Sequence, residues 1–157
     1  MTPHAIPLGP ADAGEILTLQ RAAYVTEARA HGDLSLPPLT QTLPELLDEL
    51  ARPQVLGFGV RAAARLVAAV RIRVDGTVGH LGRLTVAPDL HGQGLGSALL
   101  TAVETRLPAG ITELRLFTGE HSPANLRLYH RFGYRETGRT PVPGYRLVHL
   151  VKALPGR

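Results

Sequence analysis

Apolar and polar residues recur along this chain with two different periods, which separate predicted strands from predicted helices. Between residues 70 and 75, Val70, Ile72 and Val74 alternate with Arg71 and Arg73. This two-residue period predicts a strand with one face toward solvent. Leucines at 43, 46, 47 and 50 recur instead with the spacing of a helix, after a capping box formed by residues 42 and 45.

The same reasoning predicts the order of elements along the chain. Strands are expected at 6–8, 55–61, 66–74, 78–86, 113–118, 134–137 and 146–152, and helices at 12–29, 43–53, 95–107 and 123–133. Segments 31–41 and 140–144 contain two prolines each and are expected to be loops. A short connection and an Asp-Gly turn join the strands between 55 and 86 into an antiparallel meander. The helix at 95–107 makes strand 113–118 parallel to strand 78–86. An α+β fold in one domain, 1–157, is expected.

The turn His91-Gly92-Gln93-Gly94-Leu95-Gly96-Ser97 joins a predicted strand to a predicted helix and carries glycine at alternate positions. Glycine lets the backbone turn freely and lets a ligand approach closely. The first N–H groups of a helix have no partner within it, and the helix dipole places positive charge there. The turn therefore predicts an anion site, most naturally for a phosphate. A tight connection without a ligand is the alternative.

Two other phosphate-binding motifs fit this turn poorly. A P-loop needs a lysine after its glycines, but Lys152 is the only lysine of the chain. A dinucleotide fingerprint needs a third glycine at position 97, where the chain has Ser97. One observation favours a nucleotide-binding oxidoreductase: Glu120 follows the next predicted strand, where a ribose-binding acid would be expected.

Composition narrows the classes of function. The chain has 157 residues, no cysteine and a net charge of +4, and 17 residues are lysine or arginine. The absence of cysteine excludes disulfides and thiol nucleophiles. The basic residues are spread along the chain, which favours a solvated basic surface over a nucleic-acid site and would attract a small polyanion. No apolar run of about 18 residues predicts a membrane span, no signal peptide is evident, and a cytoplasmic location is expected. Histidine spacing indicates no metal site.

A second group of candidate residues lies on the helix after Ser122, which is expected to act as its cap. Asn125 and Tyr129 are four residues apart and therefore share one face of that helix. Both should project near the carboxyl end of the preceding strand, where ligands of α/β sheets tend to bind.

With both motifs present, the chain resembles the GNAT superfamily of acyl-CoA-dependent N-acyltransferases. The resemblance rests on Leu84-Thr85-Val86-Ala87-Pro88, on the glycine turn, and on the segment from Asn125 to Tyr134 with its Phe-Gly-Tyr end. It is strongest between residues 80 and 138. His91 is a departure, because it stands where the family most often has arginine or glutamine. The family's fold implies a mixed, mostly antiparallel sheet of six or seven strands with about four helices, in which strands 78–86 and 113–118 splay apart.

The resemblance also implies a reaction and its residues. Acetyl-CoA would enter as a wedge between the splayed strands, and its thioester would lie near the Val86 N–H, an oxyanion donor. An amine would attack directly, with Tyr129 as general acid. His80 is the first candidate base, ahead of Glu27, Glu120 and His121, and a water chain is at least as good. The cofactor-binding residues implied are Leu84, Thr85, Val86, His91, Gly92, Gln93, Gly94, Leu95, Gly96, Ser97 and Asn125.

The acceptor is expected to be a small-molecule or peptide amine lying against residues 24–41, where Glu27 and Asp33 would attract a cation. No nucleic acid, membrane or metal partner is expected, and a homodimer is left open. Three alternatives to an N-acetyltransferase stand: a non-catalytic acyl-CoA-binding regulatory module, the nucleotide-binding oxidoreductase, and a nucleic-acid-binding protein. Retention on DNA that weakens with salt would mark the last of these.

Overall fold

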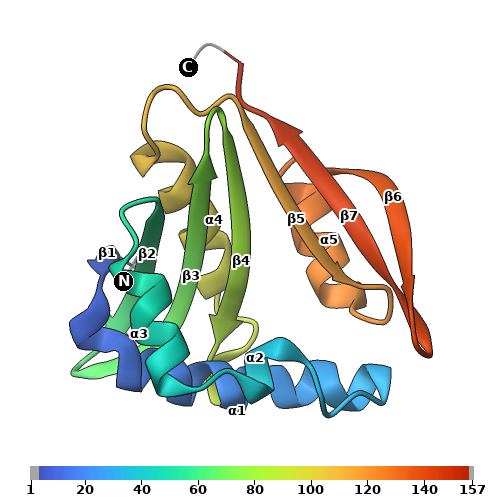
Figure 1. Cartoon of the computed structure of the whole chain (residues 1–157), viewed down its shortest axis with the longest axis horizontal. Helices are drawn as coiled ribbons and strands as arrows, with labels where there is room; N and C mark the ends of the chain where they lie inside the picture. The colour runs from blue at the N-terminus through green and yellow to red at the C-terminus, as the bar shows by residue number, and fades with distance from the viewer. Residues whose placement is uncertain (1–3, 156–157) are drawn as a thin grey trace.

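Seven strands form one mixed sheet in the part of the chain that the structure, a computed structural model, describes, residues 4–155 (Figure 1). The strands are β1 (Ala5–Leu8), β2 (Val55–Ala62), β3 (Arg65–Asp75), β4 (Val78–Val86), β5 (Glu113–Gly119), β6 (Arg135–Val142) and β7 (Tyr145–Ala153). The helices are α1 (Ala13–His31), α2 (Pro37–Thr40), α3 (Leu43–Ala51), α4 (Leu95–Arg106) and α5 (Pro123–Arg131). Short 3-10 turns, η1 (Pro10–Asp12) and η2 (Pro88–Leu90), precede α1 and the glycine turn.

The spatial order of the sheet is β1-β2-β3-β4-β5-β7-β6, and β4 with β5 is its parallel pair within the described residues. All other neighbours pair antiparallel. Helix α4 forms the crossover that makes β4 and β5 parallel, as the sequence predicted. A doubly wound nucleotide-binding fold has a mostly parallel sheet, so this topology rules out the oxidoreductase alternative.

Helices cover both faces of the sheet. In Figure 1, α3 lies in front of β2 and α1 runs across the lower ends of the strands, while α4 and α5 lie behind the sheet. The apolar faces of these layers meet in one continuous core, which includes Leu46, Ile72, Leu99, Leu114, Val148 and Leu150. Among residues 4–155 no helix is long and apolar enough to cross a membrane.

Most predicted elements are confirmed to within a few residues, and two segments expected to be loops are partly regular. Segment 31–41 contains the single-turn helix α2, which begins at its two prolines because proline suits the first turn of a helix. Strand β6 continues through Pro141 to Val142 rather than ending at residue 137. It is an edge strand, where proline does not interrupt a ladder on the open side.

Arg71 corrects the prediction that one face of β3 is open to solvent. Its side chain is 5% exposed, because α1 and α3 cover this part of the strand. The guanidinium donates to the Glu49 carboxylate and, over 3.0 Å, to the Gln20 side-chain oxygen. Burial acts to lower the pKa of Arg71, and Glu49 opposes that shift. The period of two predicted the strand correctly, but it could not reveal a buried charge that is paired.

Candidate functional site

A wedge-shaped opening separates β4 from β5 at the centre of the sheet (Figure 1). The two strands pair over only three positions, of which His80 opposite Arg115 is the last. Beyond it lies a cavity of about 520 Å³, called here the wedge cavity, whose lining includes Leu81, Leu84, Leu116, Tyr129 and Tyr145. The splay predicted between residues 78–86 and 113–118 is confirmed.

Strand β4 carries a bulge beside this cavity. Ala69 and Arg71 of β3 pair with Thr85 and Gly82, so two residues of β4, Arg83 and Leu84, oppose one of β3. Arg83 has φ 56°, in the left-handed region that a side-chain-bearing residue rarely adopts. A bulge bends a strand and redirects the side chains around it. The bulge thus separates the paired start of β4 from the half that faces the cavity.

The backbone of β4 beyond the bulge offers unpaired groups toward β5. Ala87 donates its N–H to the Val67 carbonyl of β3 over 2.8 Å. Successive residues of an antiparallel pair point their N–H groups to opposite edges. The N–H of Val86 therefore points away from β3, toward the side that β5 has left.

The glycine turn and the start of α4 form a cradle of amide groups. Gly92 and Gly94 have φ of 79° and 80°, which explains glycine at both positions. Gly94 is the N-cap and has no side chain to satisfy the first-turn N–H groups, and no acidic residue lies in that turn. Arg131 donates to the Ser97 hydroxyl over 3.2 Å and so adds a positive charge beside the turn. These features fit an anion.

More than half of the proposed cofactor residues surround a smaller cavity of about 240 Å³ next to the turn, called here the turn cavity. Leu84, Thr85, Val86, His91, Gly96 and Asn125 all line it. It shares Tyr24, Glu27, Leu84 and Asn125 with the wedge cavity. His91 donates from Nε2 to the Val86 carbonyl over 3.3 Å. The other proposed cofactor residues do not line the turn cavity: Gly92, Gln93, Gly94, Leu95 and Ser97. Leu95 packs into the core.

Tyr129 lies in the wedge cavity, where the sequence analysis expected it to meet the substrate. Its side chain is 5% exposed, and its hydroxyl makes no hydrogen bond with any residue that the structure describes. Burial raises the pKa of Tyr129 well above its usual value, with smaller contributions from Tyr24, Tyr134 and Glu27. The hydroxyl is therefore protonated at neutral pH and free to donate into the cavity.

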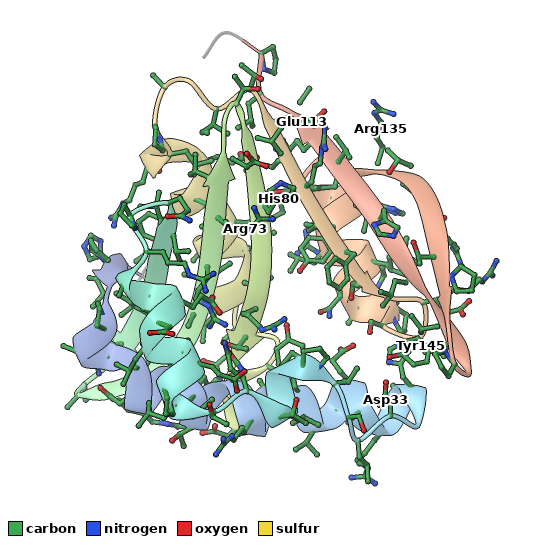
Figure 2. All side chains as sticks on the ribbon, viewed as in Figure 1. Asp33, Arg73, His80, Glu113, Arg135 and Tyr145 are labelled. Carbon is green, nitrogen blue, oxygen red and sulfur yellow. The ribbon has the colours of Figure 1, made fainter. Side chains whose placement is uncertain are left out.

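Glu27 and Asp33, expected to attract a cationic acceptor, are engaged with their own protein. Glu27 accepts from the Ser122 hydroxyl and, over 3.3 Å, from the Asn125 amide. Ser122 thus binds across to α1 instead of capping α5, since no side-chain cap bond is formed. Asp33 accepts from the Tyr145 hydroxyl over 2.8 Å, a contact that joins the α1–α2 segment to β7 (Figure 2).

His31 completes this network through both nitrogens of its ring. Its Nδ1 donates to the Glu27 backbone carbonyl over 2.9 Å, and its Nε2 accepts the His121 backbone N–H over 2.9 Å. Both ring nitrogens of His31 therefore bind backbone groups of the protein. His121 contributes its backbone to this contact, and its ring lies 5.2 Å from that of His31.

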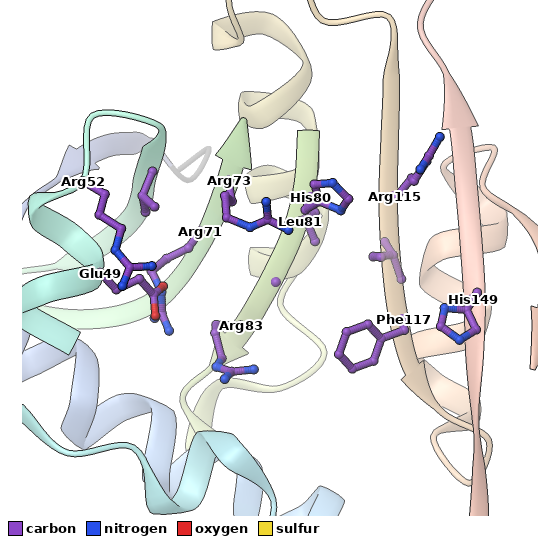
Figure 3. Close-up of a pocket in the computed structure, with 13 residues that line it drawn as sticks. Glu49, Arg52, Arg71, Arg73, His80, Leu81, Arg83, Arg115, Phe117 and His149 are labelled. Carbon is purple, nitrogen blue, oxygen red and sulfur yellow. The ribbon is translucent and has the colours of Figure 1, made fainter. Parts of the chain in front are cut away.

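His80 is not in the wedge cavity. It lies in a neighbouring cavity of about 470 Å³, called here the arginine cavity, which is lined by Arg52, Arg71, Arg73, Arg83, Arg115, Glu49, His149 and others (Figure 3). Burial lowers the pKa of His80, and the charges of Arg73 and Arg115 lower it further. The structure thus separates His80 from Tyr129, although Leu81, Gly82, Arg83, Leu116 and Phe117 border both cavities.

Glu120, the remaining candidate base, is occupied at the far end of β5. It accepts from the Arg146 backbone N–H and from the Arg146 side chain, and it pairs with Arg139. Sequence reasoning missed Tyr24 and Arg83, which face the cavities. Neither belongs to a motif, and the bulge that aims Arg83 depends on pairing between distant strands. Among residues 4–155 no group of three or more metal-binding side chains is assembled.

Comparison with known proteins identifies similar sequences and folds. Residues 39–153 match the family model described as an acetyltransferase (GNAT) domain. An IAA acetyltransferase of Azospirillum brasilense is 30% identical over 95 residues, which are 59% of this chain and 62% of that protein. The match thus spans about three fifths of that relative's length.

Two solved structures illustrate the likeness of fold. The PaiA N-acetyltransferase of Thermoplasma acidophilum, in complex with coenzyme A, is 19% identical with a TM-score of 0.76, over 95% of this chain and 98% of that chain. The ribosomal-protein-S18-alanine N-acetyltransferase of Escherichia coli is 18% identical with a TM-score of 0.78, over 97% and 94% of the two chains.

Proposed function

Because the chain belongs to the GNAT acetyltransferase family, we propose that it transfers the acetyl group of acetyl-CoA to a primary amine by direct attack within a ternary complex. The observation that carries this proposal is the wedge between β4 and β5. Pairing of the two strands ends at His80, and the wedge cavity beyond it is lined by Tyr129. The turn cavity, which shares four lining residues with the wedge cavity, is lined by Gly96 of the first turn of α4.

The residues around the turn cavity fit the co-substrate. The free first-turn N–H groups of α4, at Leu95, Gly96 and Ser97, would bind the pyrophosphate together with the turn from Gly92 to Gly94. The edge of β4 from Leu84 to Val86 would pair with the amide-bearing pantetheine arm. His91 donates to the Val86 carbonyl rather than pointing to the cradle, so backbone amides would carry most of the phosphate contact.

Val86 would stabilise the charge that develops during the reaction. As the amine nitrogen bonds to the thioester carbon, the carbonyl oxygen becomes an oxyanion, which the Val86 N–H is oriented to bind. Collapse of that intermediate breaks the carbon–sulfur bond and releases the thiolate of coenzyme A. The amine loses a proton, and the thiolate gains one, so the two proton transfers balance.

Tyr129 would act on the departing sulfur. A free tyrosine has a pKa of about 10 and a thiol about 8.5, and burial raises both because each anion is desolvated. The raised pKa of Tyr129 makes a full phenolate costly. We therefore assign Tyr129 primarily as a hydrogen-bond donor that stabilises the thiolate and can pass its proton to it.

The group best placed to accept the amine proton, His80, lies in the arginine cavity. His80 lines this cavity, and its lowered pKa leaves the ring neutral at pH 7 and able to accept a proton. The amine would react in the wedge cavity near Tyr129, whereas His80 lies in the arginine cavity. A water between the imidazole and the amine would therefore carry the proton to His80. Glu27 is less suited, because hydrogen bonds from Ser122 and Asn125 already occupy its carboxylate.

Two measurements test the proposal and separate it from a non-catalytic acyl-CoA-binding module. Calorimetry with acetyl-CoA and coenzyme A tests the cradle, and thiol release in the presence of a panel of amines tests the chemistry. Binding together with amine-dependent thiol release supports an N-acetyltransferase. Binding without release for any amine supports the module, and the absence of binding at millimolar concentration refutes both.

A further inference from the structure

The arginine cavity has a charge that the acetyl-transfer reaction does not itself require. Five arginines line it, with Glu49 as the single acidic side chain among its lining residues. Figure 3 shows Arg73 on β3 and Arg83 on β4, the neighbouring strand, while Glu49 lies at the α3 side of the cavity. Such a concentration of positive charge in a hollow attracts anions and repels cations.

Two of the five arginines are neutralised by partners. Arg71 pairs with Glu49, and Arg115 pairs with Glu113. The side chains of Arg52, Arg73 and Arg83 form no hydrogen bond or ion pair with any residue between 4 and 155. The Nε of Arg83 is moreover shielded from solvent and has no acceptor among the described groups. A buried N–H donor without a partner is costly, which indicates that a ligand supplies the acceptor.

The position of these arginines relates them to the reacting atoms. Arg83 borders both the arginine cavity and the wedge cavity, since its left-handed backbone at the bulge places it between them. A ligand whose anionic end sits in the arginine cavity can therefore extend its other end past Gly82 toward the proposed thioester. The acids of the α1–α2 segment, Glu27 and Asp33, line the wedge cavity and are not among the residues that line the arginine cavity.

Resting on the acetyl transfer proposed above, we propose that the acceptor is an amine that also carries a carboxylate or phosphate group, which Arg73 and Arg83 bind. A polyamine, which has no anionic group, is repelled from the cavity.

The experiment compares matched acceptors that differ in the presence of an anionic group. γ-Aminobutyrate is paired with its methyl ester, O-phosphoethanolamine with ethanolamine, and spermidine serves as the cationic acceptor. Binding to the protein loaded with coenzyme A is measured by calorimetry, and turnover with acetyl-CoA by thiol release. The two pairs also distinguish a carboxylate from a phosphate as the recognised group.

Variants assign the preference to the cavity. KM for the anionic acceptor should rise about tenfold or more in Arg83→Gln, because Arg83 is partly buried, and less in Arg73→Gln, because Arg73 is exposed. KM for acetyl-CoA should not change, and KM for the neutral twin should change far less than KM for the anionic acceptor. Arg135→Gln is the matched control, because Arg135 is exposed at the start of β6, away from the cavity (Figure 2).

The outcomes separate this inference from the proposed function. Tighter binding of either anionic amine than of its neutral twin, lost in the two variants but kept in Arg135→Gln, supports the inference. The inference is overturned by equal or weaker binding of both anionic amines, by a preference for spermidine, or by a preference for the anionic amine that survives in both variants. In each of these cases, acetyl-CoA binding and acetylation of other amines would leave the proposed function intact. Failure of acetyl-CoA itself to bind would instead refute the proposed function.

Discussion

Replacing Tyr129 by phenylalanine isolates the role of one hydroxyl group. The hydroxyl makes no hydrogen bond with the described residues, so its removal leaves no buried group unpaired. The phenylalanine ring would keep the edge-on contact with Tyr134, whose ring centroid lies 5.7 Å away. The free energy of unfolding and the affinity for acetyl-CoA should therefore hardly change.

The size of the rate loss distinguishes two roles for Tyr129. A charge-assisted hydrogen bond to the thiolate contributes about 1.5–3 kcal/mol, which corresponds to a decrease in kcat of roughly 10- to 150-fold. A complete general-acid step contributes about 10²- to 10⁴-fold. Because burial raises the pKa of Tyr129, we expect a value in the lower range.

Initial rates of thiol release at saturating acetyl-CoA, calorimetry and thermal unfolding provide the three measurements for this variant. Tyr134→Phe is the matched control, because Tyr134 is also buried, with a raised pKa, but does not line the wedge cavity. Unchanged turnover in Tyr129→Phe would remove the hydroxyl from the mechanism. An equal loss in Tyr134→Phe would show that the effect is structural.

Three further predictions follow from particular contacts. Gly94→Ala forces a residue with a side chain to adopt a φ of 80°, which should cost about 1 kcal/mol of stability and weaken acetyl-CoA binding in calorimetry. Gly76→Ala is the control, at φ 60° in a remote hairpin. It should lose similar stability but bind acetyl-CoA as tightly as the unchanged protein. Arg71→Met should reduce the free energy of unfolding, measured in urea, by about 2–3 kcal/mol. This is below the range for a fully buried pair because Glu49 is 27% exposed. Arg65→Met breaks an exposed pair, and an equal or larger loss in that variant would contradict the prediction. Since the pKa of His80 is lowered from 6.5, kcat/KM should fall only below pH 6.5, and His80→Gln should remove that acid limb; a limb that persists would identify another base.

The sign of the His80 effect on stability follows from the same shift. The folded protein holds His80 with a lowered pKa, so the unfolded chain binds more protons once the pH falls below 6.5. Stability contributed by the neutral ring is therefore present above that pH and is lost as the pH falls toward the folded-state value. Thermal unfolding of His80→Gln should show a weaker dependence on pH in this window.

Local patterns in the sequence were sufficient for the elements and for the amide cradle. The strand period at Val70 and Ile72, the Thr42 capping box and the glycines at 92 and 94 each act over a few residues, and each is confirmed by the structure. The Asn125 and Tyr129 spacing likewise placed both residues at one cavity. These features depend on backbone geometry within single turns, which neighbouring residues determine.

Only the tertiary structure decided which charges are used and which are free. Arg71 and Arg83 look alike in the sequence, but α3 brings Glu49 to Arg71, while the bulge between β3 and β4 leaves Arg83 without a partner at the boundary of two cavities. Glu27 and Asp33 are similarly engaged by Ser122 and Tyr145, which are distant in the chain. A charge becomes paired or free according to long-range packing, and no local pattern of residues contains that information.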